Sequence, residues 1–209
     1  MLAVLLDRLR GAQAVNEFVV ATTDQSQDIA IAELAAAEGF ACYRGSEDDV
    51  LDRFYQTARL HCADLIVRLT ADNPLMDAEL VDWLVNQFRS ANPAVDYAAL
   101  SPEAGFPHGL GGEIFTMRAL GLAWQQSTDA AQREHVTAFI YQHPELFRRA
   151  KLGCEANYSH LRVTVDTPAD FELVRRIFTE IGRTRFPWRE VPALLERQPD
   201  LLAPHAALS

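Results

Sequence analysis

Residues 64–77 read DLIVRLTADNPLMD and decide the fold. Their first six residues are mostly apolar, which predicts a strand buried on both faces of a sheet. The apolar run stops at Thr-Ala-Asp-Asn-Pro, where Asp and Asn favour a turn and Pro74 cannot donate to a sheet ladder. Asp72 is therefore expected just past the carboxyl end of a central parallel strand, which is the edge where open α/β sheets bind ligands.

The carboxylate of Asp72 has two interpretations. At this edge of a sheet it is a natural ligand for a hard cation that carries phosphates. Alternatively, it only caps the turn before a helix that begins near Asp77, because Asp is common at caps and turns. This stretch alone leaves both interpretations open.

Around this stretch the chain alternates short β-branched runs with amphipathic helical patterns. Strands are expected at residues 17–22, 40–43, 64–69, 95–100, 113–116 and 161–165. Helices are expected at residues 2–12, 26–38, 50–61, 78–90, 119–126, 134–143, 168–181 and 187–198. The alternation predicts an α/β fold with a mostly parallel sheet covered by helices on both faces. We expect one domain over residues 1–182, followed by a short C-terminal helix and tail over residues 183–209.

Composition excludes several classes of protein. The formal net charge of −10 over 209 residues argues against a nucleic-acid surface and against an anionic membrane surface. Cys42, Cys62 and Cys154 are far apart and outside any CxxC spacing, so neither a disulfide framework nor a zinc site is expected. No apolar run approaches membrane-spanning length. These features fit a protein of the reducing cytoplasm.

A second acidic residue follows a predicted strand in residues 161–170, LRVTVDTPAD. Thr167, Pro168 and Asp170 form a capping-box-like helix start, which explains them structurally. Asp166 stands at the strand end, as Asp72 does. Two carboxylates at the carboxyl ends of two strands of one sheet can converge on a divalent ion, which would neutralise and orient a triphosphate.

Residues 44–54, RGSEDDVLDRF, allow two interpretations. One is an N-capped helix with acidic residues near its positive end, and the charge pattern alone favours it. The other is a nucleotide site in which the Gly45-Ser46 backbone contacts a base or ribose and Arg53 lies near phosphate or substrate.

Residues 132–137, QREHVT, place a charged triplet before an apolar helix. Such triplets are usually a solvated face. His135 could also act as a general acid or base, or bond substrate hydroxyls, because its side chain titrates near neutral pH.

In this order, these stretches resemble the cytidylyltransferase family that includes CMP-sialic acid synthetases and the spore-coat polysaccharide proteins, with the spore-coat branch the more similar. The resemblance extends to about Ile181. It is most specific at residues 19–23 (VVATT), 44–53 (RGSEDDVLDR), 68–75 (RLTADNPL), 133–137 (REHVT) and 159–170 (SHLRVTVDTPAD).

This resemblance implies a nucleotide-diphospho-sugar transferase fold, a GT-A-like and Rossmann-like three-layer α/β sandwich. It also implies Mg²⁺-dependent transfer of CMP from CTP to a sugar, an acidic one, with release of pyrophosphate. The metal carboxylates of the family match Asp72 and Asp166. We further assign catalytic roles to Arg68, Asp72 and His135, and nucleotide or sugar contacts to Gly45, Ser46, Arg53, Arg133 and Glu113.

The chain departs from the family pattern in two places. Family members open with a strand and a basic loop, roughly Ala-Arg-x-x-Ser-x-Arg-Leu-Pro-x-Lys, that grips the triphosphate, whereas Met1-Leu2 aligns with the helix after that loop. We therefore expect either an N-terminally truncated chain or a variant with impaired catalysis. Relatives usually read Pro-Asp-Gly-Leu-Asp-x-Glu where this chain keeps Glu113 but has His108 and Gly111, which leaves the acceptor sugar open.

Two other functions remain possible from the sequence. One is a GT-A glycosyltransferase that uses a nucleotide sugar, and the other is a non-catalytic remnant that binds a nucleotide or a partner. Without a central strand the sheet would expose strand edges, so we also expect a homodimer or a strand borrowed from a neighbour.

Overall fold

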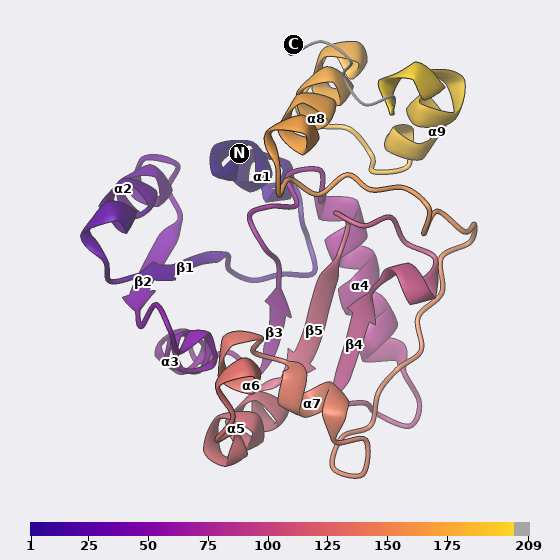
Figure 1. Ribbon diagram of the computed structural model, residues 1–209. Coiled ribbons are helices and arrows are strands. Elements are labelled where there is room, and N and C mark those ends of the chain that lie inside the picture. Colours follow the sequence, from indigo (N-terminus) through magenta and orange to yellow (C-terminus); the bar gives the residue numbers. More distant parts are fainter. Residues whose placement is uncertain (203–209) are drawn as a thin grey trace.

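A computed structural model describes residues 1–202 of the chain. It is an α/β protein, as predicted, with strands at the centre and helices around them (Figure 1). The strands are β1 (Val19–Thr23), β2 (Ala41–Gly45), β3 (Leu65–Arg68), β4 (Tyr97–Leu100) and β5 (Gly112–Thr116). The α-helices are α1 (Leu2–Leu9), α2 (Ile29–Ala37), α3 (Val50–Leu60), α4 (Ala78–Ser90), α5 (Met117–Gln126), α6 (Ala130–Glu134), α7 (Ala138–Gln142), α8 (Pro168–Ile181) and α9 (Glu190–Arg197).

The strands of the described residues form two sheets. β1 and β2 pair in parallel, from Val19 opposite Ala41 to Thr23 opposite Gly45. The other sheet has the order β3-β5-β4, and β5 runs antiparallel to both neighbours. The α/β class is confirmed, but the direction of β5 differs from the expectation of a mostly parallel sheet. β4 and β5 are joined by a loop without a crossover helix, so the chain reverses between them.

Helices cover both faces of the β3-β5-β4 sheet, as the alternating pattern predicts (Figure 1). On one face, α4 buries Leu80, Leu84 and Val85 in a core that also contains Ile114 of β5. On the other face, side chains of α3, α5 and α7 form a second core around Phe115. Residues 64–69 are less buried than expected. Every residue of β3 is only half-buried, because β3 lies at the edge of its sheet.

Two predicted elements differ from the structure. The helix expected at residues 134–143 is two short helices, α6 and α7, because Val136 between them has a φ of +51° that no helix accommodates. Residues 161–165 are not a strand of either sheet. They run beside the loop before β5 and form one isolated parallel bridge, between His108 and Arg162.

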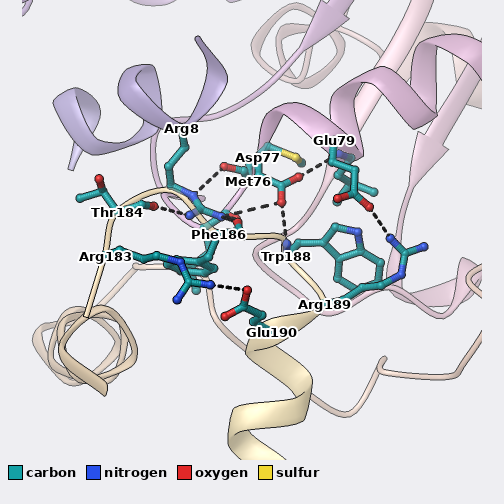
Figure 2. Close-up of polar contacts among 12 residues, drawn as sticks. Arg8, Met76, Asp77, Glu79, Arg183, Thr184, Phe186, Trp188, Arg189 and Glu190 are labelled. Atoms are coloured by element: carbon teal, nitrogen blue, oxygen red, sulfur yellow. Dashed lines mark hydrogen bonds and ion pairs between the residues drawn. The ribbon is translucent and has the colours of Figure 1, made fainter. Parts of the chain in front are cut away.

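A buried arginine joins α1 to the turn after β3 and to the segment between α8 and α9 (Figure 2). The Arg8 side chain is fully buried and donates to the carbonyl oxygens of Leu75 at 2.8 Å, Met76 at 3.1 Å, Thr184 at 2.5 Å and Phe186 at 3.1 Å. Its guanidinium also lies 4.0 Å from the ring centroid of Phe186. These contacts fasten α1, the turn after β3 and the α8–α9 connection to one another.

Asp77 is the charged neighbour of Arg8 in this cluster, at 4.0 Å. Its carboxylate caps α4 by accepting from the Leu80 amide at 2.8 Å, and it accepts from the Trp188 amide at 2.5 Å. Burial lowers the pKa of Arg8 to about 10, so Arg8 is still charged at neutral pH. Burial also raises the pKa of Asp77.

The segment after α8 packs into the same core as α4. Phe186, Trp188 and Leu195 are buried there, so residues 183–202 lie against the domain predicted for residues 1–182. The rest of the predicted tail, residues 203–209, falls outside the described part. Over residues 1–202, none of the helices has both the length and the apolar character needed to cross a bilayer.

Candidate functional site

The two acidic segments singled out in the sequence lie side by side. The backbone amide of Val165 donates to the carbonyl oxygen of Asp72 at 2.9 Å, and the Thr164 hydroxyl lies 3.4 Å from the same oxygen. Asp72 follows β3 by four residues, and Asp166 directly follows Val165. The turn after β3 and the segment before α8 therefore bring Asp72 and Asp166 to the same edge of the molecule.

Asp77 is the N-cap of α4, and Asp72 belongs to the turn before that helix, as its turn interpretation expects. The Asp72 carboxylate accepts from the Thr70 hydroxyl, and Thr70 in turn accepts from the Asn73 amide group at 3.0 Å. These bonds order the turn and hold a half-buried carboxylate at its surface. Asp72 can order the turn and bind a ligand at the same time. Its Oδ1 accepts from Thr70, whereas its Oδ2 accepts no hydrogen bond from residues 1–202.

Asp166 is more exposed and is paired with Arg162. Asp170 lies next to it and closes the predicted capping box of α8 with Thr167, which confirms that interpretation of Thr167 and Asp170. Bonds from Thr167 and from the Asp166 amide, which outweigh the effect of partial burial, hold the pKa of Asp170 below its usual value.

The donor set at this edge fits a magnesium ion that arrives with phosphates. Within the described residues, no group of three or more His, Cys, Asp or Glu side chains could hold a metal by itself. Mg²⁺ is commonly bound by one or two carboxylates plus substrate phosphates and waters, rather than by an all-protein cage. Asp72 and Asp166 are two such carboxylates, so they suit Mg²⁺ with a triphosphate better than a closed structural site.

Glu113 of β5 is the centre of a second polar cluster, on the α3–α5–α7 face of the sheet. One carboxylate oxygen accepts from Arg68 at 2.6 Å, and the other accepts from the Tyr97 hydroxyl at 2.6 Å and the Thr137 hydroxyl at 2.5 Å. Burial, with the negative charge of Glu113 beside it, raises the pKa of Tyr97 far above its usual value, so Tyr97 stays a donor. Both Glu113 oxygens are occupied, and the cluster fixes Arg68 at the end of β3.

A strained residue directs His135 away from this cluster. Val136 is fully buried and has a φ of +51°, which is rare for a β-branched side chain and costs about 1–3 kcal/mol. The Thr137 amide donates to the His135 carbonyl oxygen at 2.5 Å, so the turn is tight. Thr137 consequently points inward to Glu113, while His135 is exposed and makes no side-chain hydrogen bond within residues 1–202.

The helix start after β2 confirms the capping interpretation. Asp49 caps α3 by accepting from the Asp52 amide at 2.9 Å. The Arg53 guanidinium donates to the Ser46 carbonyl oxygen at 2.6 Å, and a side chain at Gly45 would meet Tyr43 at 2.9 Å. Gly45, Ser46 and Arg53 thus meet at the carboxyl end of β2. The Ser46 hydroxyl also accepts from the Asp49 amide at 3.0 Å, so these residues build the helix start, and their contact with a nucleotide stays a prediction.

Arg133 is committed to bonds within the protein. Its guanidinium pairs with Asp49 at 2.7 Å and donates to the carbonyl oxygens of Trp124 and Ser127 at 3.2 and 3.1 Å. Arg133 therefore braces α6 against α3 and α5, and its assignment to nucleotide or sugar stays a prediction.

Arg68 links the clusters along the chain. It ends β3, four residues before Asp72, and its guanidinium lies 5.8 Å from the ring centroid of Phe54, the neighbour of Arg53 on α3. The Nε atoms of Arg53 and Arg68 are buried without a hydrogen-bond partner among the described residues. Sequence reasoning missed Tyr97 and Thr137, because nothing in the sequence shows which side chains face Glu113 across strands.

Comparison with known proteins agrees with the predicted family. A family model described as cytidylyltransferase matches residues 1–186. The spore coat polysaccharide biosynthesis protein SpsF of Bacillus subtilis (strain 168) is 30% identical over 208 residues, covering 96% of this chain and 85% of the relative.

Two solved structures have a similar fold. A cytidylyltransferase from Leptospira borgpetersenii serovar Hardjo-bovis (strain JB197) superposes with a TM-score of 0.92 at 25% identity, over 100% of this chain and 87% of that one. A CMP:2-keto-3-deoxy-manno-octonic acid synthetase complexed with CTP superposes with a TM-score of 0.62 at 17% identity, over 86% of this chain and 87% of that one. The second similarity concerns the fold alone.

Proposed function

The chain belongs to the cytidylyltransferase family, and we propose that it transfers CMP from CTP to a hydroxyl group of an acidic sugar and releases pyrophosphate. In this reaction the sugar oxygen bonds to the α-phosphorus of CTP, and the bond from that phosphorus to the bridging oxygen of the β-phosphate breaks. The proton of the sugar hydroxyl leaves to a base or to solvent. The observation that carries the proposal is the adjacency of Asp72 and Asp166, fixed by the bond between Val165 and Asp72.

We assign Asp72 and Asp166 to a magnesium ion bound together with the triphosphate. When bound, Mg²⁺ would neutralise part of the phosphate charge and polarise the attacked phosphorus. The protein's own contribution is to orient the Asp72 carboxylate through the Thr70 bond and to keep the backbone of the Asp166 segment beside it through the bond from Val165.

The nucleoside is assigned to the carboxyl end of β2. There the Arg53 guanidinium and the Ser46 carbonyl oxygen, which bond to each other, bring together a donor and an acceptor of the kinds that a base and a ribose bind. The family model that matches residues 1–186 is described as cytidylyltransferase, which supports the choice of CTP as the nucleotide.

The sugar is assigned to the side of β3 that carries the Glu113 cluster. Glu113 holds Arg68 at the end of β3, whereas Val136 turns His135 outward, where its exposed imidazole is open to a substrate. An arginine suits the carboxylate of an acidic sugar because its planar fork matches that group. His135 is proposed to bond or deprotonate the attacking hydroxyl.

The relative from Bacillus subtilis is named for spore coat polysaccharide biosynthesis, and we extend a role in surface polysaccharide biosynthesis to this chain. We place it in the cytoplasm, where CTP is available, and we propose a homodimer. β1 and β3 each have a hydrogen-bonded strand on one side only among the described residues, and such edges favour pairing.

The test is pyrophosphate release from CTP and Mg²⁺ in the presence of a panel of acidic sugars, with no nucleotide sugar added. Pyrophosphate that depends on both the sugar and Asp72 supports the proposal, with Asp64→Asn, at the other end of β3, as the matched control. Transfer from a nucleotide sugar without pyrophosphate release would assign the chain to glycosyltransferases instead. CTP binding without turnover would assign it to non-catalytic binding proteins.

A further inference from the structure

Arg162 lies between two carboxylates at the proposed metal site. Its guanidinium bonds to Asp166 and lies 3.4 Å from Asp170. Within residues 1–202 these are its only hydrogen-bond partners, and about half of the Arg162 and Asp166 side chains is exposed, at 49% and 52%. One of the two carboxylates proposed to bind Mg²⁺ is therefore already occupied by a cation that belongs to the protein.

The backbone at Arg162 is fixed on both sides. The His108 amide donates to the Leu161 carbonyl oxygen at 2.9 Å, and the Val163 amide donates to the His108 carbonyl oxygen at 2.7 Å. The approach is so close that a Cβ on Gly109, whose φ is +100°, would lie 2.2 Å from the Thr164 nitrogen. Only the long side chain of Arg162 can change position while this backbone remains in place.

The two partners of Arg162 differ in how firmly they are held. Asp170 accepts from the amides of Asp166 and Thr167 and from the Thr167 hydroxyl, at 2.9–3.1 Å. The carboxylate of Asp166 has no partner except Arg162 among the described residues. Arg162 can thus release Asp166 and remain beside Asp170, whereas Asp170 is committed to the start of α8.

From this arrangement we propose that Arg162 is a placeholder cation that neutralises Asp166 until a divalent ion binds. Arg162 bonds one oxygen of Asp166, and a guanidinium and a divalent ion on the same carboxylate repel each other, so metal binding at Asp166 favours displacement of the guanidinium. The released guanidinium then faces the phosphates that accompany the metal and donates to one of them, because Arg matches phosphate geometry. The first step rests only on the proposed metal assignment of Asp166, whereas the second also rests on the proposed use of CTP.

The consequence is that the metal and the nucleotide bind together. Free metal has to break the Arg162–Asp166 pair without compensation, so it binds weakly. A metal–nucleotide complex offers Arg162 a new anionic partner at the moment it loses Asp166. The pair therefore favours entry of the metal and the nucleotide together over entry of metal alone.

The experiment titrates Mn²⁺ into the protein without nucleotide and follows the loss of the free Mn²⁺ signal by electron paramagnetic resonance. Arg162→Gln is expected to bind Mn²⁺ about fivefold more tightly than the wild type, the scale expected for removing one exposed ion pair. Adding Asp166→Asn to Arg162→Gln should abolish the gain. Arg175→Gln, which removes an exposed arginine paired with Glu172 on α8, is the matched control and should leave Mn²⁺ affinity unchanged.

A second titration uses Mg²⁺ and CTP, with binding measured by calorimetry. Arg162→Gln should weaken nucleotide binding about tenfold, the loss expected for one charge-assisted hydrogen bond to phosphate. Equal Mn²⁺ affinity in wild type and Arg162→Gln, with both variants folded by circular dichroism, would overturn the placeholder role. If Mn²⁺ affinity rises but wild type does not bind Mg²⁺–CTP, the placeholder role stands and the proposed function is wrong.

Discussion

The amide of Val165 donates to the carbonyl oxygen of Asp72 at 2.9 Å, and this one bond joins the turn after β3 to the segment before α8. It brings Asp72 and Asp166, which belong to distant parts of the sequence, to one edge of the fold. Both carboxylates keep lone pairs that no other described residue uses. The proposed function depends on this relationship, and the first prediction tests it.

Asp72→Asn should abolish Mg²⁺-dependent binding of CTP while leaving the fold intact, because the amide keeps the shape of the carboxylate but not its charge. Asp166→Asn should act in the same way. Calorimetric titration of CTP with and without Mg²⁺ measures the effect, and circular dichroism verifies the fold. Asp64→Asn, at the exposed amino end of β3, should retain wild-type affinity. Unchanged affinity in Asp72→Asn would count against the metal assignment.

Glu113→Gln should lower kcat/KM for the acceptor sugar by about tenfold or more, because Arg68 loses a charged hydrogen bond of about 1.5–3 kcal/mol. Arg68→Lys should have a similar effect, and the double variant should lose no more than the worse single variant, because the two side chains act as a unit. The KM for CTP should change little. Steady-state kinetics measures all three, with Glu196→Gln on α9 as a remote exposed control. Losses that simply add would contradict the coupling.

Arg8→Met should destabilise the protein by about 3–5 kcal/mol, since Asp77 remains buried without its charged neighbour and four carbonyl oxygens lose a donor (Figure 2). Arg8→Lys should not restore stability fully, because one ammonium group cannot reach four carbonyl oxygens in that geometry. Urea unfolding measures the change. Arg10→Gln, which removes an exposed pair with Glu38, should cost about 1 kcal/mol or less. Equal losses for Arg8→Met and Arg10→Gln would refute a central role for Arg8.

Acid should destabilise the turn after β1 through Asp28. Hydrogen bonds from the Thr23 and Thr22 hydroxyls and the Thr23 amide hold the pKa of Asp28 below its usual value of 3.8. The folded state therefore favours the charged form, and the stabilisation is present above pH 3.8 and is lost as pH falls through the lower folded-state value. The melting temperature of wild type should fall more steeply below about pH 4 than that of Asp28→Asn. Parallel curves for the two proteins would contradict this assignment.

Much of the fold follows from local pattern. α4 and α8 lie where their spacing predicts, because each buries one apolar stripe and begins at a recognisable cap, Asp77 or Thr167. The direction of β5 could not be predicted, since hydrophobic alternation does not encode strand direction. The segment at residues 161–165 has the composition of a strand, yet its partner is a loop rather than a strand.

The site residues also divide into those that the sequence pattern reveals and those that it does not. Asp72 and Asp166 could be singled out because each follows an apolar run and ends at a turn, and the structure does bring their segments together. In the sequence, Arg8 looks like an ordinary polar residue of an amphipathic helix. Its burial is explained only by the carbonyl oxygens that bind it, which come from distant parts of the sequence. The strain at Val136 was equally hidden, because tertiary packing overrides the helical preference of residues 134–143.

The most direct test of the central claim is a phosphorus NMR spectrum of purified protein incubated with CTP, Mg²⁺ and an acidic sugar. The proposed function predicts that the three CTP resonances decline together, while a phosphodiester resonance of a CMP-sugar and a pyrophosphate resonance rise in equal amounts. CTP that stays intact with every acidic sugar, while a nucleotide sugar added in its place is consumed, would contradict it.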